Sequence, residues 1–573
     1  MSSWSAWDHR YPEPDTSAQL IALEHLENLA TLQSTNASLA AELDAMALPV
    51  FAPPGPARPS TVRRHLNRVE RCWRRLPAVR RMPPFLAVVL AVQAGLSLRL
   101  IWSNTAFADE ALYLWAGHLE WQHWLHGTSI AGQRLPTFFS GAPVVYPPIG
   151  ALADSVAGLA GARLLSLAFM LAATALLYAT SRLLYGARSA AFASGLFAGL
   201  AAAQFLGAFA TYDAMALFLL ALATWLGVRA ALHVPAAIRV ALYMASGAAL
   251  AVANTAKYAS VLFDPVVIGV IALAVWRNAS VRRAFAAAVI PLGTAAIALA
   301  AALIAGGHDY LAGAETTTLA RVTGTTPILA VLTPSGQWVG ALAFLAVCGA
   351  AAAGCSHGWR EGLLGCCLAA GVFLAPAEQA RIHTLTSLFK HVGYGGWFGA
   401  IVAGYALAAL MNAVPRHKGG KAALLGTASI VITAAAGLAL AGEHFAGWPN
   451  STRMISQLAP AMETAGCPCL ITQNNDVEYY LHQSTRLDII RNGFSFYYWD
   501  RESRREVSGT PAYQAAIRAH YFRVLEVDPT LNPLIYQPII QTLATTPGYR
   551  SIGTSPSGVA SEPAQVWVLG GGE

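Results

Sequence analysis

Charged residues are scarce in this chain of 573 residues: Asp, Glu, Lys and Arg make up 12% of it, whereas 55% of it is hydrophobic. Soluble globular proteins carry about 25% charged residues. The scarcity excludes an ordinary soluble protein and predicts an α-helical, polytopic membrane protein. The formal net charge is +7, but the basic residues stand in short clusters between apolar runs. That placement is typical of membrane topology and does not indicate a nucleic-acid partner.

Cysteine is also scarce, with seven residues in the chain. Four of them lie in or beside apolar segments, as packing residues do. Cys467 and Cys469 form a close pair in a polar region, where either a disulfide or two free thiols could occur, and free thiols are favoured. No set of Cys and His has the spacing of a zinc site, although one or two carboxylates could still hold a divalent metal ion.

The beginning of the chain lacks the basic region and apolar core of a cleavable signal peptide. Residues 1–81 are predicted to form a cytoplasmic N-terminal extension. Leucines at near-helical spacing predict a helix over 18–48, which could form a short coiled coil or contact a partner protein. A proline-rich linker over 49–60 and an arginine-rich juxtamembrane segment follow. The arginines either bind anionic lipid headgroups or only keep the N-terminus in the cytoplasm, and the second is favoured.

Eleven apolar stretches of roughly membrane-crossing length follow the arginines. They are expected near 84–102, 159–181, 189–208, 213–231, 237–254, 258–276, 284–305, 337–354, 361–376, 391–411 and 421–441. The short basic connectors then all fall on the side of the N-terminal arginines, which is the cytoplasmic side of a plasma (inner) membrane. The division near 254–258 has an alternative, one long bent helix, which would invert every later span and break this charge pattern.

The same topology predicts two further domains. Residues 82–441 form the transmembrane domain, with a first outer loop over 103–150 that begins as an amphipathic helix at the interface. Residues 442–573 form a small extracytoplasmic α/β domain, because short strand-like and helix-like segments alternate there. The loop 376–391 could act as a mobile gate.

Ionisable residues gather where helices reach the outer side. Asp109 and Glu110 follow the first span, and Asp213 opens a later one. Such residues are costly in a membrane and mark a functional site by default. Tyr146, Lys257, Lys390 and His391 are predicted on the same side. Cations suit a lipid-linked phosphate, and a carboxylate suits proton removal from an acceptor hydroxyl.

Several motifs occur in order along this topology. They are FADEALY at 107–113, YPPIG at 146–150, GARLLS at 161–166, RLLYG at 182–186, TYDAMALFLLALA at 211–223 and AKYAS at 256–260. With this set the chain resembles integral-membrane glycosyltransferases of the GT-C structural class. In particular it resembles the bacterial relatives of protein O-mannosyltransferases and of lipid A aminoarabinose transferases.

The resemblance implies an inverting glycosyltransferase, hexosyl or pentosyl, that uses a sugar on a polyprenyl phosphate at the outer face of the membrane. It implies that Asp109 is the general base, that Asp213 organises the site, and that Glu110 orients the acceptor or binds a headgroup. Candidate cations for the leaving phosphate are Lys257, Lys390 and Arg163, with His391 helping to position it. The acceptor could be a lipid, a polysaccharide or a protein.

Each residue also has a plain structural interpretation. The acids at 109, 110 and 213 could simply cap helices, and the cations at 163, 257 and 390 could simply anchor helices at the interface. His118, His123 and His126 could suggest a metal site, but their spacing favours interfacial anchoring. For the whole protein, the alternatives are a transporter or flippase of lipid-linked sugars, or a non-catalytic membrane scaffold. The lack of an internal repeat and the acids at the outer interface favour the enzyme.

Overall fold

A computed structural model describes residues 83–570, apart from 131–132, 233, 414–418, 466–467, 473, 483–489, 493–495, 530–532 and 558–561. The predicted helix, linker and arginine-rich segment within residues 1–81 lie outside the described residues, as does Cys467. Cys469 is disulfide-bonded. The expectation of a free thiol at that position is therefore wrong.

The chain is a multi-pass membrane protein. In the described part, ten helices are long and apolar enough to cross a membrane. They are α3 (Pro84–Ile101), α5 (Tyr146–Tyr185), α8 (Tyr212–Ala231), α9 (Ala236–Ala256), a 3-10 helix (Tyr258–Phe263) continued by α10 (Asp264–Trp276), α11 (Val281–Gly306), α13 (Ile328–Ser335) continued by α14 (Ala341–His357), α15 (Trp359–Arg381), α16 (Leu388–Ala413) and α17 (Gly419–Ala446).

Several of these helices differ in extent from the sequence expectation. The stretch expected at 189–208 is not one of these ten, because it is divided into two shorter helices, α6 (Ala187–Gly199) and α7 (Ala201–Leu206). The stretch expected at 159–181 belongs to a 40-residue helix that bends at Ala157 and Gly158, where the glycine adopts φ +61°. The division near 254–258 is confirmed, because α9 ends at Ala256 and the next helix starts at Tyr258.

The segment 103–150, predicted as the first outer loop, contains the predicted helix, α4 (Ala108–His126). Its first turn is capped by Glu110, whose Oε2 accepts a hydrogen bond from the Phe107 backbone N–H at 3.0 Å. Gly117 lies against the start of α5, where an added Cβ would overlap the Pro147 carbonyl oxygen. This close approach joins the helix that carries Asp109 to the membrane domain. Beyond α11, the loop before α13 holds the short helix α12 (His308–Ala314).

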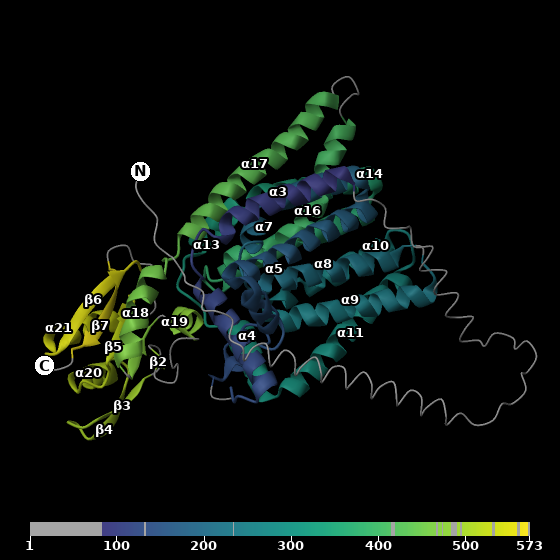
Figure 1. Ribbon diagram of the computed structural model, residues 1–573. Helices are drawn as coiled ribbons and strands as arrows, with labels where there is room; N and C mark the ends of the chain where they lie inside the picture. Colours follow the sequence, from purple (N-terminus) through teal and green to yellow (C-terminus); the bar gives the residue numbers. More distant parts are fainter. Residues whose placement is uncertain are drawn as a thin grey trace, which may run out of the picture. The chain divides into compact units, whose positions relative to one another are not determined.

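Small residues bring the membrane helices together. At Gly404 on α16, an added Cβ would lie 2.5 Å from the Ala193 backbone nitrogen on α6. Most of α16 is buried. Figure 1 shows α8, α9 and α11 running side by side. The first turns of α8 and α16 are therefore held by packed helices.

The C-terminal part is a small α/β region, as predicted. The strands are β1 (Cys469–Ile471), β2 (Ile490–Asn492), β3 (Tyr497–Asp500), β4 (Arg505–Ser508), β5 (Val524–Val527), β6 (Tyr549–Ser555) and β7 (Ala564–Leu569). The five-stranded sheet has the order β2-β1-β5-β7-β6, and β3 pairs with β4 in a separate hairpin. Figure 1 shows β5, β6 and β7 side by side. Strand β1 is parallel to β2 and β5, whereas β7 is antiparallel to β5 and β6. The helices are α18 (Thr452–Ala465), α19 (Asn474–Leu481), α20 (Thr510–Arg518) and α21 (Pro533–Thr545).

Candidate functional site

A charged cluster forms where the first turns of α4, α8 and α16 meet. The Lys390 Nζ donates a hydrogen bond to Asp109 Oδ2 at 2.6 Å and lies 3.9 Å from Asp213 Oδ2. The Asp109 side chain remains one-third exposed, at 33%, whereas that of Asp213 is completely buried. One lysine thus faces two carboxylates, of which one is open to a ligand.

Asp213 is held by neighbours on several sides. Its Oδ2 accepts a hydrogen bond from Thr211 Oγ1 at 2.9 Å, and its Oδ1 accepts one from the Tyr394 hydroxyl at 3.2 Å. His391 approaches Oδ1 to 4.0 Å. The buried Nε2 of His391 makes no hydrogen bond to a described residue. With both oxygens occupied, Asp213 is arranged to position the cations around it.

Lys257 reaches the same cluster from the end of α9. Backbone hydrogen bonds tie its segment to the first outer loop, from Ala142 N to Thr255 O at 2.8 Å and from Tyr258 N to Ser140 O at 2.9 Å. Its Nζ donates to Ser140 Oγ at 3.0 Å and lies 4.6 Å from the centre of the Tyr212 ring.

Opposing electrostatic effects act on the pKa of Lys257. Burial lowers the pKa of its ammonium to about 8, the nearby Asp213 opposes this shift, and Lys390 adds to it. The Tyr212 hydroxyl, beside the ammonium, also bonds the Tyr113 hydroxyl. Burial, followed by the negative charge of Asp109, raises the pKa of Tyr113 well above its ordinary value. These hydroxyls therefore serve as neutral hydrogen-bonding groups.

Arg321 is a cation of the site that the sequence analysis missed. It lies in the loop after α12, which is fixed by backbone hydrogen bonds from Gly324 N to Ile382 O at 2.9 Å and from Thr326 N to His383 O at 3.0 Å. The half-buried Arg321 makes no hydrogen bond or ion pair with any residue of the described ranges. Burial lowers the pKa of its guanidinium, and the charges of Glu378 and Asp109 oppose that shift. A lone arginine in a loop that the sequence predicted on the outer side, against the positive-inside pattern, was the signal that could have found it.

Glu110 and Arg163 form a pair of their own, away from the cluster. Both side chains are fully buried, and the guanidinium donates from Nε to Oε1 at 2.9 Å and from Nη2 to Oε2 at 2.7 Å. The remaining N–H groups of Arg163 bond three carbonyls where the chain passes from α3 to α4: those of Ile101, Asn104 and Thr105. Glu110 also accepts from the Ala210 N–H at 2.7 Å. Since all five guanidinium N–H groups are used, Arg163 has none free for a phosphate in this arrangement.

Tyr146 begins α5 behind the cluster. It is fully buried, its ring lies 6.3 Å from that of Tyr212, and its hydroxyl has no hydrogen-bond partner among the described residues. It therefore supports the Tyr212 ring without facing the cavity described next.

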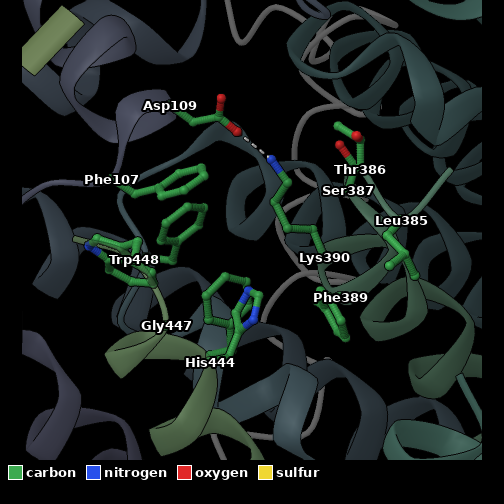
Figure 2. Close-up of a pocket in the computed structure, with 12 residues that line it drawn as sticks. Phe107, Asp109, Leu385, Thr386, Ser387, Phe389, Lys390, His444, Gly447 and Trp448 are labelled. Carbon is green, nitrogen blue, oxygen red and sulfur yellow. Dashed lines mark hydrogen bonds and ion pairs between the residues drawn. The ribbon is translucent and has the colours of Figure 1, made fainter. Parts of the chain in front are cut away.

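A cavity of about 470 Å³ opens beside Asp109 and Lys390. Figure 2 shows the ion pair at one edge, with Phe107, Trp448 and His444 on one side and Phe389 and Leu385 on the other. Its remaining lining residues are Phe205, Phe209, Thr386, Ser387 and Gly447. The aromatic residues after 440 come from the junction of α17 with the C-terminal region and were not predicted as site residues.

A second cavity, of about 450 Å³, is lined by residues of the segments 142–144 and 254–261 and of α11 and α12, but not by Lys257 itself. Thr255, Tyr258 and Ala142 form one wall, and the aliphatic side chains Leu299 and Leu303 of α11 form another. The lining is mostly apolar. The segment that directs Lys257 toward the cluster thus also lines an apolar cavity.

The histidines of the first outer loop have different partners. His118 Nε2 lies 2.7 Å from Asp154 Oδ2, and its ring stacks on His482 with centres 5.1 Å apart. His123 Nδ1 lies 2.8 Å from the Thr128 carbonyl oxygen. Within the described ranges, no group of three or more His, Cys, Asp or Glu residues is placed to hold a metal ion.

No protein-family model and no curated protein sequence matches this chain. Solved structures do match it. ArnT from Cupriavidus metallidurans, bound to undecaprenyl phosphate, matches with a TM-score of 0.56 and 14% identity, over 85% of this chain and 98% of that one. The Archaeoglobus fulgidus oligosaccharyltransferase tethered to an acceptor peptide matches with a TM-score of 0.53 and 14% identity, over 82% and 73%.

A third match is the archaeal oligosaccharyltransferase AglB from Archaeoglobus fulgidus, in complex with an inhibitory peptide and a dolichol-phosphate. Its TM-score is 0.53 at 13% identity, over 82% of this chain and 72% of that one. At such identities the likeness concerns the fold. The chain has the GT-C glycosyltransferase fold, as the ordered sequence motifs predicted.

Proposed function

We propose that this protein is an inverting glycosyltransferase that moves a sugar from a polyprenyl phosphate to an acceptor hydroxyl at the outer face of the plasma membrane. The observation that carries the proposal is the Asp109–Lys390 pair at the edge of the cavity, with Asp213, Lys257 and Arg321 behind it. This site combines a partly open carboxylate with three cations. Solved proteins of the same fold hold undecaprenyl phosphate or dolichol-phosphate, which supports a lipid phosphate as the donor carrier.

The arrangement of the carboxylates supports a single displacement. A retaining enzyme of this chemistry needs a second carboxylate free to attack the sugar, about 5 Å from the first. Asp213 is buried, and its two oxygens accept hydrogen bonds from Thr211 and Tyr394. Asp109 therefore acts as the general base. It takes the proton of the acceptor hydroxyl while the acceptor oxygen bonds to the anomeric carbon.

In the same step the bond between the anomeric carbon and the phosphate oxygen breaks, and the electron pair leaves with the polyprenyl phosphate. Negative charge on that phosphate needs fixed cations. Lys257 and Arg321 fit this role, because Arg321 has no ion-pair partner among the described residues and Lys257 contacts neutral hydroxyl oxygens. Lys390 holds Asp109 in place, and His391 lies beside the same carboxylate cluster.

The apolar cavity lined by Thr255 and Tyr258, the neighbours of Lys257, is suited to the lipid part of the donor. A polyprenyl chain there would lie between α11 and the segment 254–258, with its phosphate directed toward the cations. Because the chain passes to this cavity from lipid that is equally apolar, its burial there gains little free energy, and the charged phosphate at the cations would supply the specific affinity for the donor.

The distribution of basic residues supports an active site at the outer face of the membrane. Arg277 donates to the Leu184 carbonyl at 3.1 Å and pairs with Glu361 at 3.4 Å, so the basic connectors of several helices meet at one end. The cluster around Asp109 occupies the opposite helix ends, at the first turns of α8 and α16 and the last turn of α9. Because basic connectors face the cytoplasm, the active site faces outward, as does the α/β domain over 442–573.

The test is to incubate the purified protein with radiolabelled polyprenyl-phosphate sugars, hexosyl and pentosyl, together with host membranes. Asp109→Asn is compared with the matched control Asp309→Asn, an acid on α12 whose side chain is 51% exposed. Label should move from lipid to acceptor with wild type and the control, and fall about 10²- to 10⁴-fold with Asp109→Asn. Binding of the donor without its consumption would favour a transporter instead. An arm with EDTA is included because an oligosaccharyltransferase of this fold was solved with zinc and sulfate.

A further inference from the structure

The wall of the cavity beside Asp109 indicates what kind of acceptor it receives, an inference that rests on the proposed function. Its aromatic side chains come from distant parts of the chain: Phe107, Phe205, Phe209, Phe389, His444 and Trp448. The volume, about 470 Å³, lies in the range of small-molecule sites. We propose that the acceptor is an uncharged sugar of a glycan, whose ring stacks in this cavity with one hydroxyl at Asp109.

The charge of the wall argues against a phosphate or carboxylate acceptor. Among the described lining residues, Asp109 and Lys390 are the only acid and the only lysine or arginine, and they bond one another at 2.6 Å. An anionic acceptor would bring negative charge beside Asp109 without a free cation in this wall. Its desolvation would then go uncompensated. An uncharged hydroxyl avoids this cost.

The aromatic rings argue for a sugar over a hydrocarbon chain. Phe107 and Trp448 meet edge to face with centres 5.4 Å apart, and Phe389 and His444 lie 4.5 Å apart. Rings held in this way present faces and edges to the cavity, and the C–H face of a sugar packs against an aromatic face. The cavity beside α11 differs from this one, because its wall is mostly Ala, Val and Leu with two tyrosines, a lining that suits a hydrocarbon chain.

The loop that completes the cavity adds polar groups. Thr386 and Ser387 line it beside Lys390. Ser387 adopts φ +70° and His383 adopts φ +51°, conformations that are uncommon outside glycine. Such backbone strain gathers at ligand sites, where the surrounding structure maintains it. The two hydroxyls can therefore receive the sugar's own hydroxyls at the cavity edge.

The test uses the full protein, a donor that it consumes with host membranes, and three defined acceptors. These are octyl glycosides of neutral hexoses and pentoses, the same glycosides carrying a phosphate, and a Ser/Thr peptide. Three variants are compared: Trp448→Phe, which keeps a ring; Trp448→Leu, which keeps only apolar volume; and Trp124→Leu, a change at a 47% exposed tryptophan outside the cavity. Retained binding of polyprenyl phosphate verifies that each variant is folded.

We expect transfer to neutral glycosides, with KM raised about tenfold by Trp448→Leu, the size of a lost stacking contact, and much less by Trp448→Phe. Trp124→Leu should match wild type. The proposal is overturned if the phosphorylated glycoside or the peptide is the preferred acceptor, or if Trp448→Leu and Trp448→Phe have the same effect on KM. A protein that consumes no donor with any acceptor or with host membranes would overturn the proposed function itself.

Discussion

Lys390 and Asp109, 281 residues apart in the sequence, form an ion pair of 2.6 Å at the edge of an aromatic cavity. The lysine Nζ also lies 3.9 Å from Asp213 Oδ2, so one ammonium group interacts with the partly exposed carboxylate of Asp109 and the buried carboxylate of Asp213. Each carboxylate lies in the first turn of its helix, where helix dipoles favour negative charge. This pair links the edge of the aromatic cavity to the buried carboxylate of Asp213.

Replacing Lys390 tests that link. In Lys390→Met, Asp109 loses its anchor and Asp213 loses a neighbouring cation, so we expect transfer to fall by about two orders of magnitude. Lys390→Arg should retain part of the activity, because the charge remains. Single-turnover transfer from bound donor measures the effect. The control is Arg381→Met, which removes an ion pair whose arginine side chain is 65% exposed and should change little.

Glu110 and Arg163 give a prediction about stability rather than chemistry. Both are fully buried, and together they join α4, α5 and the chain before α8. Glu110→Ala leaves a buried guanidinium unpaired, which costs about 3–5 kcal/mol. We expect a large loss of folded protein in detergent, measured by thermal unfolding with gel filtration. The double variant Glu110→Met with Arg163→Met should recover much of the loss. A double variant no more stable than Glu110→Ala would contradict the interpretation of the pair as a brace.

Local sequence patterns predicted most of the elements that carry the site. The division at 254–258, the helix after Phe107 and the α/β class of the C-terminal region each follow from apolar periodicity and polar breaks, whereas β3, β4 and β6 were not predicted. The extents of α5, α13 and α15 were not predicted, because proline and polar residues near the helix ends belong to the helices. Pro147, Pro334 and Pro376 are all helical. Packing in the membrane domain accommodates Pro334 and Pro376 inside their helices, whereas Pro147 stands in the first turn of α5, where proline is favourable.

The contacts of the site were harder to predict, because they join residues far apart in the chain. The sequence placed Asp109, Asp213, Lys257 and Lys390 on one side of the membrane, and the structure brings these four together. The sequence could not show that Arg163 pairs with Glu110. A lone arginine near a helix end fits a phosphate ligand, a lipid anchor or an ion pair equally well. The hydroxyls of Ser140 and Tyr394 carried no pattern at all.

Lys257 predicts a pH dependence of donor affinity. Burial lowers its pKa to about 8, so the ammonium loses its proton as the pH rises through that value. The protonated fraction then falls about tenfold between pH 7 and pH 9, and the donor KM should rise to a similar extent. Lys257→Arg keeps its charge over this range and should have a flat profile. If wild type and Lys257→Arg had the same pH profile of donor KM, the pH dependence would not come from Lys257.

Asp476, at the start of α19, predicts how pH acts on stability. Burial, reinforced by the negative charges of Glu526 and Glu110, raises the pKa of its carboxyl to about 7, whereas an unfolded aspartate has a pKa of about 3.9. Between these values the folded protein binds the extra proton, so protonation stabilises it. The contribution is fully present below about pH 4 and is lost as the pH rises through about 7, with a slope of at most about 1.4 kcal/mol per pH unit.

The variant Asp476→Asn isolates this contribution, because an amide does not titrate. The difference in melting temperature between wild type and variant should therefore change between about pH 4 and pH 7 and be constant above about pH 8. Thermal unfolding of the full protein in one detergent, across this range, measures the difference. A difference that does not vary with pH would mean that Asp476 ionises alike in the folded and unfolded protein.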